Sequence, residues 1–377
     1  MIQDTKKRVA LVHDYLNDFG GAERVLKVLS EIYPDAPIYT IFTVKGSSAY
    51  KKFKDKKIVE SWFAKIPFCH KLISPLRFLL PAIWNSFDLS EYDLVITSAS
   101  WAVTKGLKRG KVTKEICYLH TPPRWLYGYD ESRNWENKWY GTLVKGYALI
   151  VGHLLRQYDF RQAQKVDLFI VNSENVARRI EKFYRRKADH IIYPPVDVEK
   201  FKSLKNPYFK GKYYLTGGRM TSAKNFDLII KVFNELKLHL KIYGSGILEK
   251  ELRGMANKNV EFVGKVNDQE LVELYQGARA FITAQKDEDF GITPVEAMAA
   301  GTPVIAYFGG GYKETVVEDK TGIFFEALSV ESLKRAVQSF ETSGYKKIRS
   351  ADCIKQAEKF SKDNFVKQFK RVVEDVM

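Results

Sequence analysis

The sequence has few cysteines and no long hydrophobic run. Its 377 residues include three cysteines, Cys69, Cys117 and Cys353, which lie far apart and form no CxxC pair. We therefore expect neither a disulfide framework nor a cysteine metal cluster, and a cytoplasmic location is indicated. No apolar run approaches the ~20 residues that span a bilayer. The polar stretch Met1–Lys7 predicts no secretory signal.

Positive charge is in excess, and most of it lies in the first half of the chain. The formal net charge is +16; residues 1–205 contain 35 Lys and Arg against 22 Asp and Glu, and the remainder contains 26 against 23. Such a basic half predicts an anionic partner: nucleic acid, a phosphate-bearing substrate or a membrane surface. No recognition motif of a nucleic-acid-binding module is present. We therefore expect no nucleic-acid partner, and a basic nucleic-acid- or membrane-binding protein is kept as the non-enzyme alternative.

Short apolar runs rich in β-forming residues alternate with segments of helical periodicity, which is typical of an α/β fold with parallel sheets. A first series contains the predicted strands Val9–His13, Tyr92–Thr97, Ile116–Leu119 and Leu168–Asn172 and the predicted helices Ala22–Ile32 and Val176–Tyr184. A second series follows the turn-rich stretch Lys205–Lys212. Its predicted strands are Tyr213–Thr216, Leu240–Tyr243, Val260–Val263, Ala280–Thr283 and Val304–Tyr307, and its predicted helices are Phe226–Leu236, Leu248–Met255, Gln269–Gln276 and Pro294–Ala300. Two doubly wound domains, joined near residue 205, are expected.

Paired glycines follow the first predicted strand. Gly20 and Gly21 lie before a predicted helix, where the backbone can approach a ligand closely and helix N–H groups can meet an anion. A tight turn explains the pair equally well and is favoured for the pair on its own. The spacing is not GxGxxG, which disfavours a nicotinamide dinucleotide domain.

Two further loops carry cations or a histidine after predicted strands. His120 directly follows the strand Ile116–Leu119 and precedes a Pro-Pro pair, which favours a functional histidine over a structural one. Gly218 and Arg219 follow the first strand of the second series, and Lys224 comes five residues later, where a helix opens. A guanidinium and an ammonium beside a glycine turn predict a diphosphate cradle.

The most specific pattern is a pair of glutamates, Glu288 and Glu296, around the start of a predicted helix. The helix dipole explains Glu296 alone but does not explain Glu288. Two carboxylates accept hydrogen bonds from hydroxyl groups, which sugars and riboses present. Asp287-Glu288-Asp289 resembles an Asp-x-Asp metal motif only superficially, and no His/Cys/Asp set elsewhere has metal-ligand spacing. We therefore expect no metal site and no cofactor.

These motifs together resemble the retaining glycosyltransferases of family four, which have the GT-B fold of two facing Rossmann-like domains. The resemblance covers nearly the whole chain and is carried by the Glu-x7-Glu pattern. It is closer to bacterial mannosyltransferases of O-antigen (lipopolysaccharide) and exopolysaccharide assembly, which share runs similar to 20–26, 120–124 and 289–296. It implies an acceptor-side domain over 1–205, a nucleotide-sugar domain over 206–356 and a C-terminal helix at about 357–377 that packs back on the first domain.

The resemblance also implies a role for each motif. Glu296 would hold the ribose of the donor, and Glu288 would hold the donor sugar. Arg219 and Lys224 would neutralise the departing diphosphate in place of a metal. His120 would hydrogen-bond the sugar. The donor site would be completed by Phe290, Gly291, Ile292, Thr293, Gly218, Gly20, Gly21 and Val266, the last of these on the side of the base.

The function implied is a metal-independent retaining hexosyltransferase, with GDP-mannose as the preferred donor. The acceptor would be a glycan or a polyprenyl-diphosphate-linked saccharide, and attack on the face that the phosphate leaves would need no protein base. A UDP-sugar donor is the alternative; an epimerase, a phosphorylase and an inactive scaffold of this fold are disfavoured. The basic, aromatic stretch Trp62–Trp84 suggests peripheral contact with the inner face of the cytoplasmic membrane, and packing of short helices explains it equally well.

Overall fold

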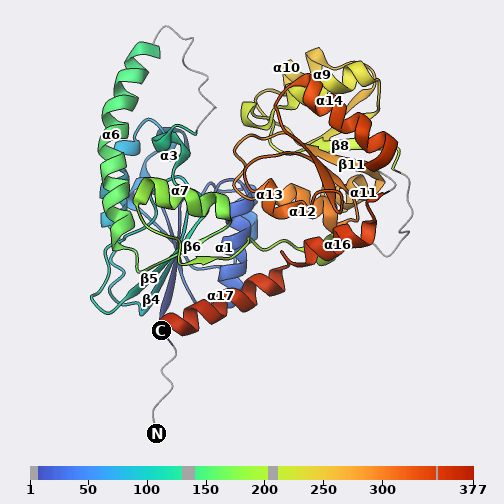
Figure 1. Cartoon of the computed structure of the whole chain (residues 1–377). Coiled ribbons are helices and arrows are strands. Elements are labelled where there is room, and N and C mark those ends of the chain that lie inside the picture. Colours follow the sequence, from blue (N-terminus) through green and yellow to red (C-terminus); the bar gives the residue numbers. More distant parts are fainter. Residues whose placement is uncertain (1–6, 130–140, 203–210, 345–346) are drawn as a thin grey trace. The chain divides into compact units, whose positions relative to one another are not determined.

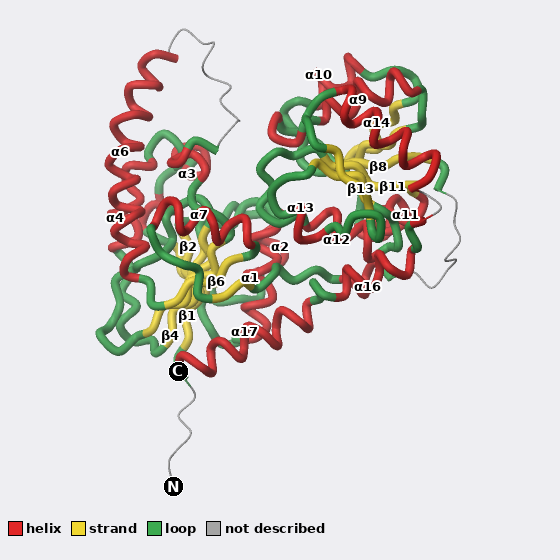
Figure 2. The backbone as a smooth tube through the Cα atoms, in the orientation of Figure 1, coloured by secondary structure: helices red, strands yellow, loops and turns green. Residues whose placement is uncertain are grey.

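A computed structural model of the chain describes residues 7–129, 141–202, 211–344 and 347–377. Its contacts divide the chain into two compact units. The first unit contains Met1–Tyr193 and Val366–Met377, and the second contains Pro194–Phe365. Each unit is built around a β-sheet of its own, which Figure 2 shows in yellow. The expected α/β architecture of two doubly wound parallel sheets is thereby confirmed.

The sheet of the first unit has seven parallel strands, in the order β3-β2-β1-β4-β5-β6-β7. In chain order they are β1 (Val9–His13), β2 (Ile38–Thr40), β3 (Ile58–Glu60), β4 (Leu94–Ala99), β5 (Lys114–Leu119), β6 (Leu168–Val171) and β7 (His190–Ile191). The strand order reverses between β1 and β4. In open parallel sheets, ligands bind at the carboxyl ends of the strands beside such a switch point.

Helices cover both faces of this sheet. Ala10 and Val12 of β1 pack against buried Phe63 and Trp84, whereas Leu11 points to the opposite face, where α1 packs on β1 and β4. The helices of the first unit are α1 (Gly21–Ile32), α2 (Ser48–Phe53), η1 (Trp62–Lys65), α3 (Cys69–Leu72), η2 (Arg77–Leu79), α4 (Leu80–Asn85), α5 (Arg124–Tyr127), α6 (Gly141–Lys165) and α7 (Glu174–Tyr184). The apolar residues that alternate along each strand are therefore covered on both sides.

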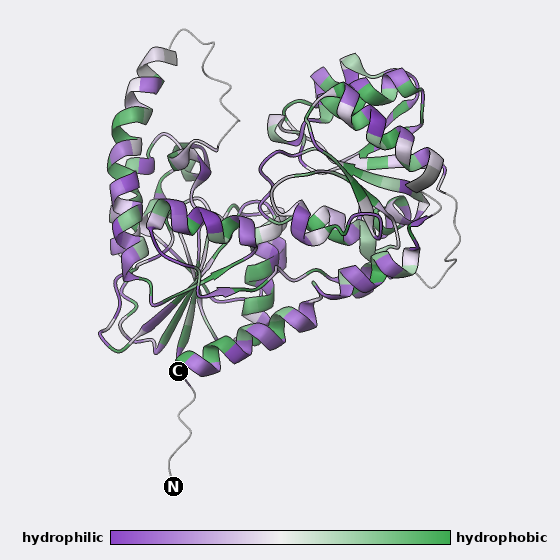
Figure 3. Cartoon of the chain, in the orientation of Figure 1, coloured by the Kyte–Doolittle hydropathy of each residue, from purple (hydrophilic) through white to green (hydrophobic). Residues whose placement is uncertain are grey.

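The sheet of the second unit has six parallel strands, in the order β10-β9-β8-β11-β12-β13. They are β8 (Tyr213–Gly217), β9 (Leu240–Tyr243), β10 (Val260–Gly264), β11 (Ala278–Thr283), β12 (Val304–Tyr307) and β13 (Gly322–Phe325). Here the order reverses between β8 and β11. Figure 3 shows hydrophobic colouring along the central strands of both sheets, as expected for strands buried on both faces.

The helices of the second unit form two groups. Helix α9 contacts α10 and α14, and α12 contacts α8, α11, α13 and α16; Figure 1 shows the two groups on opposite faces of the sheet. The bounds are α8 (Val198–Phe201), η3 (Ser222–Lys224), α9 (Phe226–Leu236), α10 (Glu249–Met255), α11 (Asp268–Gly277), α12 (Ile292–Ala299), α13 (Tyr312–Thr315), α14 (Val330–Ser339), η4 (Phe340–Gly344) and α16 (Ser350–Glu358).

The division between the units comes earlier in the chain than residue 205. Val196 forms an isolated bridge with Ser361, and α8 packs on α12, so these residues belong to the second unit. Most of the stretch 205–212, expected to join the domains, lies outside the described residues. Helix α17 (Lys362–Val376) belongs to the first unit from Val366 onward. There, burial and the charge of Glu374 raise the pKa of Tyr33 to about 12.

Several elements were not anticipated from the sequence. They include strands β2, β3 and β7, which have three residues or fewer and are too short for a periodic pattern to stand out, and strand β13. Helix α6 has 25 residues but only a weakly amphipathic pattern. Among the described residues, no helix combines the length and apolar character needed to span a membrane.

Candidate functional site

The second unit brings two of the predicted motifs together at its switch point. Strand β8 leads into Gly218, and its neighbour β11 leads into the loop with Glu288. The Nζ atom of Lys224 lies 4.0 Å from Oε2 of Glu288, and the two side chains are 24% and 19% exposed. A lysine predicted to bind the diphosphate and a glutamate predicted to bind the sugar therefore meet at the carboxyl ends of adjacent strands. Both side chains are half-buried and remain partly exposed to solvent.

Glycines are required where β8 meets this crevice. A Cβ atom on Gly217 would lie 2.3 Å from the ring of Tyr243. Gly218 has a φ of +121°, which L side chains rarely adopt, and a Cβ atom there would lie 3.6 Å from Nζ of Lys224. The turn therefore brings the backbone close to the side chain of Lys224. Arg219 follows in the same loop with an exposed side chain.

Lys224 is placed by a single helical turn. It ends η3, and Asn225 (φ +50°) then opens α9. The side-chain amide of Asn225 donates to the carbonyl oxygen of Ala284, 2.8 Å away, just after β11. This hydrogen bond ties the Lys224 loop to the loop that carries Glu288.

Glu288 is held by a tyrosine that the sequence analysis did not select. The hydroxyl of Tyr312 donates to Oε2 of Glu288 at 3.4 Å and lies 2.5 Å from Oγ1 of Thr283, the last residue of β11. Burial, followed by the charge of Glu288, raises the pKa of Tyr312 well above its ordinary value. Tyr312 therefore stays protonated and remains a hydrogen-bond donor to the carboxylate.

A run of three glycines after β12 packs against the same loop. A Cβ atom on Gly310 would lie 2.4 Å from the carbonyl oxygen of Glu288, and one on Gly311 would lie 2.4 Å from Cα of Phe290. The N–H of Gly311 donates to the carbonyl oxygen of Glu288 at 2.9 Å. Three consecutive glycines, Gly309-Gly310-Gly311, indicate such a close approach in the sequence, but they were not among the predicted site residues.

Glu296 lies deeper than Glu288. It is 2% exposed, and Tyr275 donates to its Oε2 atom at 3.2 Å. The hydroxyl of Tyr275 also lies 2.7 Å from that of Tyr243, whose ring faces Gly217. Burial, with the charges of Tyr243 and Glu296, raises the pKa of Tyr275 well above its ordinary value, so a chain of tyrosines orients this carboxylate.

The residues between the two glutamates form the start of α12. Gly291 is its N-cap, with a φ of +95°, and Ile292 and Thr293 are half-buried in its first turn, where backbone N–H groups have no partner within the helix. The Phe290 side chain packs on Phe360 with ring centres 5.3 Å apart. Any contact of Phe290 with a donor would therefore come from its backbone. Val266 is half-buried after β10, at the edge of the sheet.

In the first unit, His120 ends a buried chain of hydrogen bonds. Its Nε2 atom lies 2.9 Å from Oγ of Ser98. Nδ1 of His13 lies 3.1 Å from both Oγ and the backbone oxygen of Ser98, and Nε2 of His13 lies 3.4 Å from Oε1 of Glu23. This chain lies at the carboxyl ends of β1, β4 and β5, beside the switch point of the first sheet.

The partners of His13 define its protonation. The Ser98 carbonyl and the Glu23 carboxylate are both acceptors, so each ring nitrogen of His13 acts as a donor. Burial disfavours the imidazolium, but the hydrogen bond and charge of Glu23 outweigh burial and raise the pKa of His13 above 6.5. Burial likewise acts against the Glu23 carboxylate, yet His13 lowers the pKa of Glu23 below 4.5. Ser98 then donates to His120, whose Nε2 is the acceptor.

The same glutamate caps the glycine loop. The N–H of Gly20 donates to Oε2 of Glu23 at 2.8 Å, so Gly20 is the N-cap of α1 and Gly21 its first residue. The turn favoured for this pair on its own is thus present, and its contact with a ligand stays a prediction. Asp14, the residue after β1, accepts hydrogen bonds from Ser100 and Trp101.

Among the residues that the structure describes, no group of three or more His, Cys, Asp or Glu side chains is placed to hold a metal ion. Cys117 and Cys353 are buried and Cys69 is half-buried, all as free thiols. Burial raises the pKa of Cys117 and of Cys353 to about 12, so these two thiols are not poised for nucleophilic chemistry.

Two family models match the chain, one in each half. The model described as Glycosyltransferase Family 4 matches residues 19–200, and the model described as Glycosyl transferases group 1 matches residues 197–360. The second match contains Lys224, Glu288 and Glu296, and the first contains His120. The residues of the second-unit site and His120 therefore lie in matched regions, whereas His13 precedes the first match.

Similar proteins include transferases with different donors. The chain is 29% identical over 177 residues to the mannosylfructose-phosphate synthase of Agrobacterium fabrum, which covers 40% of this chain and 39% of that protein. It is 26% identical over 396 residues to the GDP-Man:Man(3)GlcNAc(2)-PP-Dol alpha-1,2-mannosyltransferase of Xenopus laevis, which covers 88% of this chain and 79% of that protein.

A solved structure supports the fold. The Anabaena protein Alr3699/HepE, in complex with UDP and glucose, superimposes with a TM-score of 0.71 at 16% identity, covering 98% of this chain and 100% of that one. With a family 4 match over the first half, a group 1 match over the second and a parallel sheet in each unit, the chain belongs to the GT-B glycosyltransferases of group 1 and family 4.

Proposed function

We propose that this chain is a metal-independent retaining glycosyltransferase that moves mannose from GDP-mannose to a glycan or polyprenyl-diphosphate-linked acceptor in cell-surface polysaccharide assembly. The observation that supports it most is the meeting of Lys224 and Glu288, 4.0 Å apart, beside Gly218 at the switch point of the second sheet. The crevice combines a charge for phosphate with an acceptor for sugar hydroxyls. It is the arrangement that a nucleotide sugar requires.

In the proposed reaction, the positive charges of Arg219 and Lys224 stabilise the diphosphate as it leaves. Glu288, oriented by Tyr312, accepts hydrogen bonds from hydroxyls of the sugar. Glu296, oriented by Tyr275, accepts hydrogen bonds from the ribose hydroxyls of the donor. Retention follows if the acceptor hydroxyl attacks on the face that the diphosphate leaves and the departing phosphate takes its proton, so no protein base is invoked. Metal independence follows because the two cations supply the charge themselves.

In this proposal His120 serves the hydroxyls of the donor sugar. Its Nε2 atom accepts from Ser98, so its other ring nitrogen, Nδ1, carries the hydrogen. The preferred base and sugar rest on the names of relatives. One relative's name specifies GDP-mannose, while the Anabaena structure holds UDP, so a UDP-sugar donor is the alternative.

Thermal unfolding with GDP, UDP and ADP, each with and without EDTA, tests the proposal. A nucleotide present at 100 times its Kd adds ~2.7 kcal/mol to the stability of the state that binds it. We expect stabilisation by GDP that EDTA leaves unchanged, together with mannose transfer from GDP-mannose. Stabilisation by UDP alone would replace the donor and keep the mechanism, and no shift with any of the three would overturn the transferase proposal.

A further inference from the structure

Two parts of the first unit are expected to contact the donor, His120 and the Gly20-Gly21 loop, and both are linked to the side chain of Glu23. This residue lies in the first turn of α1. Its Oε2 atom accepts from the N–H of Gly20 at 2.8 Å, and its Oε1 atom lies 3.4 Å from Nε2 of His13. One carboxylate therefore contacts the glycine loop with one oxygen and the buried histidine chain with the other.

The contact of Glu23 with the glycine loop is close. A Cβ atom on Gly20 would lie 3.1 Å from Oε2 of Glu23, and the Glu23 side chain is only 15% exposed. The preceding N–H group, that of Phe19, donates to Oγ of Ser48 at 2.9 Å. Two successive N–H groups are thereby held by side chains, so the position of the loop depends directly on the carboxylate.

Ser98 is the point at which the hydrogen bonds of the histidine chain can run in either of two directions. Its Oγ atom lies 3.1 Å from Nδ1 of His13 and 2.9 Å from Nε2 of His120. A serine hydroxyl has one hydrogen to donate, so it can serve only one of these two nitrogens at a time. Which histidine receives the hydrogen depends on whether Nδ1 of His13 already carries one.

In the charged state of His13, both ring nitrogens carry hydrogens. Nε2 donates to Glu23, and Nδ1 donates to the backbone oxygen of Ser98, 3.1 Å away. Nδ1 then cannot accept, so the Ser98 hydroxyl donates to Nε2 of His120. Burial disfavours this state, but the hydrogen bond and charge of Glu23 and the charge of Asp14 raise the pKa of His13 above 6.5.

In the neutral state of His13, the same contacts favour the opposite direction. The hydrogen lost to solvent is the one on Nδ1, because Nε2 still faces the carboxylate of Glu23. Nδ1 becomes an acceptor, and the Ser98 hydroxyl rotates to donate to it. The lone pairs of the Ser98 hydroxyl then face Nε2 of His120, which favours the tautomer with the hydrogen on Nε2. His120 thus changes the nitrogen that carries its hydrogen and keeps its net charge.

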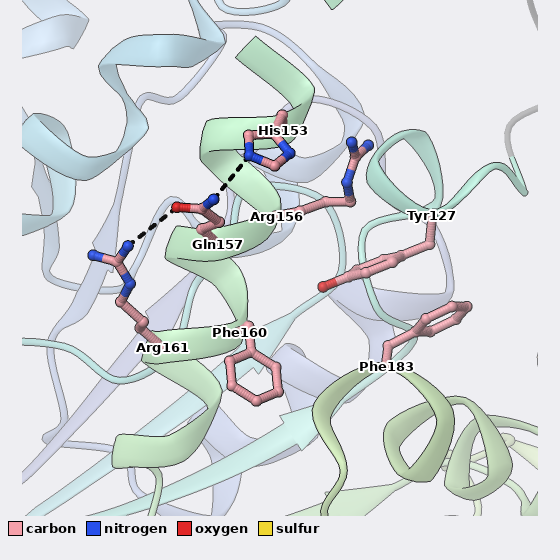
Figure 4. Close-up of a pocket in the computed structure, with 7 residues that line it drawn as sticks. All are labelled: Tyr127, His153, Arg156, Gln157, Phe160, Arg161 and Phe183. Carbon is pink, nitrogen blue, oxygen red and sulfur yellow. Dashed lines mark hydrogen bonds between the residues drawn. The ribbon is translucent and has the colours of Figure 1, made fainter. Parts of the chain in front are cut away.

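The backbone around His120 is held by other contacts. The side-chain amide of Asn172 donates to the carbonyl oxygen of His120 at 2.9 Å. In α5, which begins four residues after His120, the carbonyl oxygen of Leu126 accepts from Arg156 of α6 at 3.2 Å. Helices α5 and α6 line a cavity of about 890 Å³, and Figure 4 shows Tyr127 and Arg156 lining a smaller one of about 350 Å³. The serine hydroxyl therefore acts on the ring of His120 rather than on its backbone.

We propose that Glu23 is a positioning residue for both parts of the first unit that contact the donor. With one oxygen it fixes the Gly20 loop, and through His13 and Ser98 it determines which ring nitrogen of His120 carries the hydrogen. The inference rests on the proposed function, because it concerns the groups assigned there to the donor. Glu23 acts on transfer without touching the substrate, which distinguishes it from the two glutamates of the second unit.

Nitrogen-15 NMR of the histidine rings, recorded on the full chain over a pH series, tests this without substrate. The chain has six histidines, and His120→Gln identifies the His120 signals. In the wild type, the hydrogen of neutral His120 should move from Nδ1 to Nε2 as the pH rises through the pKa of His13. Glu23→Gln should abolish this change. Its amide oxygen can still accept from Gly20, while its amide nitrogen donates to Nε2 of His13 and so keeps the His13 hydrogen on Nδ1 at every pH.

Glu31→Gln is the matched control, because Glu31 lies on the same helix with a side chain that is 38% exposed; it should keep the wild-type change. Glu23→Ala removes both contacts and should lower kcat about 10-fold, the effect of losing one charge-assisted contact, and raise KM for the donor. Thermal unfolding checks that each variant folds, and Glu23→Gln keeps the proposal testable if Glu23→Ala does not.

A tautomer of His120 that does not change with pH in the wild type, or that changes equally in Glu23→Gln, would overturn the role of Glu23. Because this measurement needs no substrate, its failure is distinct from failure of the proposed function. Loss of the tautomer change with nucleotide stabilisation intact removes only the role of Glu23. The tautomer change without stabilisation by any nucleotide removes only the transferase proposal.

Discussion

The two sheets share one topology, but the polar groups at their switch points are organised differently. In the second unit, Lys224 and Glu288 are half-buried, Tyr312 hydrogen-bonds to Glu288, and glycines let the backbone approach both residues closely. In the first unit, His13, Ser98 and His120 are buried and hydrogen-bond to one another. Partly exposed charges are suited to an ionic ligand, whereas a buried chain of hydrogen bonds is suited to orienting a single group.

This difference predicts how strongly each crevice responds to substitution. Groups in the second unit are expected to contact the donor directly, so their removal should affect the chemical step most. In the first unit His120 and the Gly20-Gly21 loop are expected to contact the donor, and the residues behind His120 act by orienting its ring.

The largest effect is expected for Glu288→Ala. It removes the acceptor for the sugar hydroxyls and leaves Lys224 without its partner, so transfer should fall by more than the ~10³-fold that loss of one preorganised group causes. The measurement is the rate of sugar transfer together with the midpoint of thermal unfolding, which should move little. Glu326→Ala is the control, because Glu326 is an exposed carboxylate just after β13. Turnover of Glu288→Ala within a few-fold of wild type would remove Glu288 from the site.

A smaller loss is expected for each cation. Arg219→Ala and Lys224→Ala should lower kcat by ~10²–10³-fold, the range for one preorganised charge-stabilising group. Lys241→Ala is matched to Lys224→Ala, since the two lysines are 23% and 24% exposed and each lies beside a glutamate. EDTA should alter none of these rates. Restoration of the Lys224→Ala rate by added divalent metal would contradict the proposal that these cations take the place of a metal.

In the first unit, Ser98→Ala should reduce kcat by about 10-fold, because it breaks the link between His13 and His120 and a buried hydrogen bond is worth ~1 kcal/mol. The pH profile of kcat should shift as well, since His120 is then no longer connected to the charged His13–Glu23 pair. Thr97→Val is the control on the opposite face of β4. If both variants have the wild-type rate and the wild-type pH profile, the hydrogen bonds from His13 through Ser98 to His120 have no positioning role.

The smallest effect is a pH dependence of stability. The pKa of His13 is raised by Glu23, so its contribution is present below pH 6.5 and is lost as the pH rises through the raised value. The pKa of Glu23 is lowered, so its contribution is present above pH 4.5 and is lost as the pH falls through the lowered value. The pair should therefore stabilise the first unit most between these two pH values.

Denaturant unfolding of wild type and Glu23→Gln over a pH series measures this contribution. The difference in unfolding free energy should peak between pH 4.5 and 6.5 and decline on both sides. A difference that does not vary with pH would mean that His13 and Glu23 do not titrate as a pair. His13 ends β1, whereas Gly217 ends β8 in the second unit. Without the charged His13–Glu23 pair, the two units would no longer differ electrostatically at these strand ends.

Several parts of the site could be predicted from local sequence because the backbone itself determines them. Gly218 marks a positive φ, Gly291 begins α12 in a left-handed conformation, and Glu288 and Glu296 lie on either side of that helix start. Each depends on residues close in the chain. The tyrosines that hydrogen-bond to these glutamates could not be predicted from local sequence. Tyr312 lies 24 residues from Glu288, and Tyr275 lies 21 residues from Glu296.

The fold class, the two βα series and the loops that carry the predicted site residues can be derived from local sequence, because hydrophobic period, helix caps and glycine turns are local properties. Tertiary contacts alone establish that β8 lies beside β11, that His13 and His120 share Ser98, and that α5 and α6 line one cavity. Contacts of that kind join residues tens of positions apart, and no local pattern encodes which strands become neighbours.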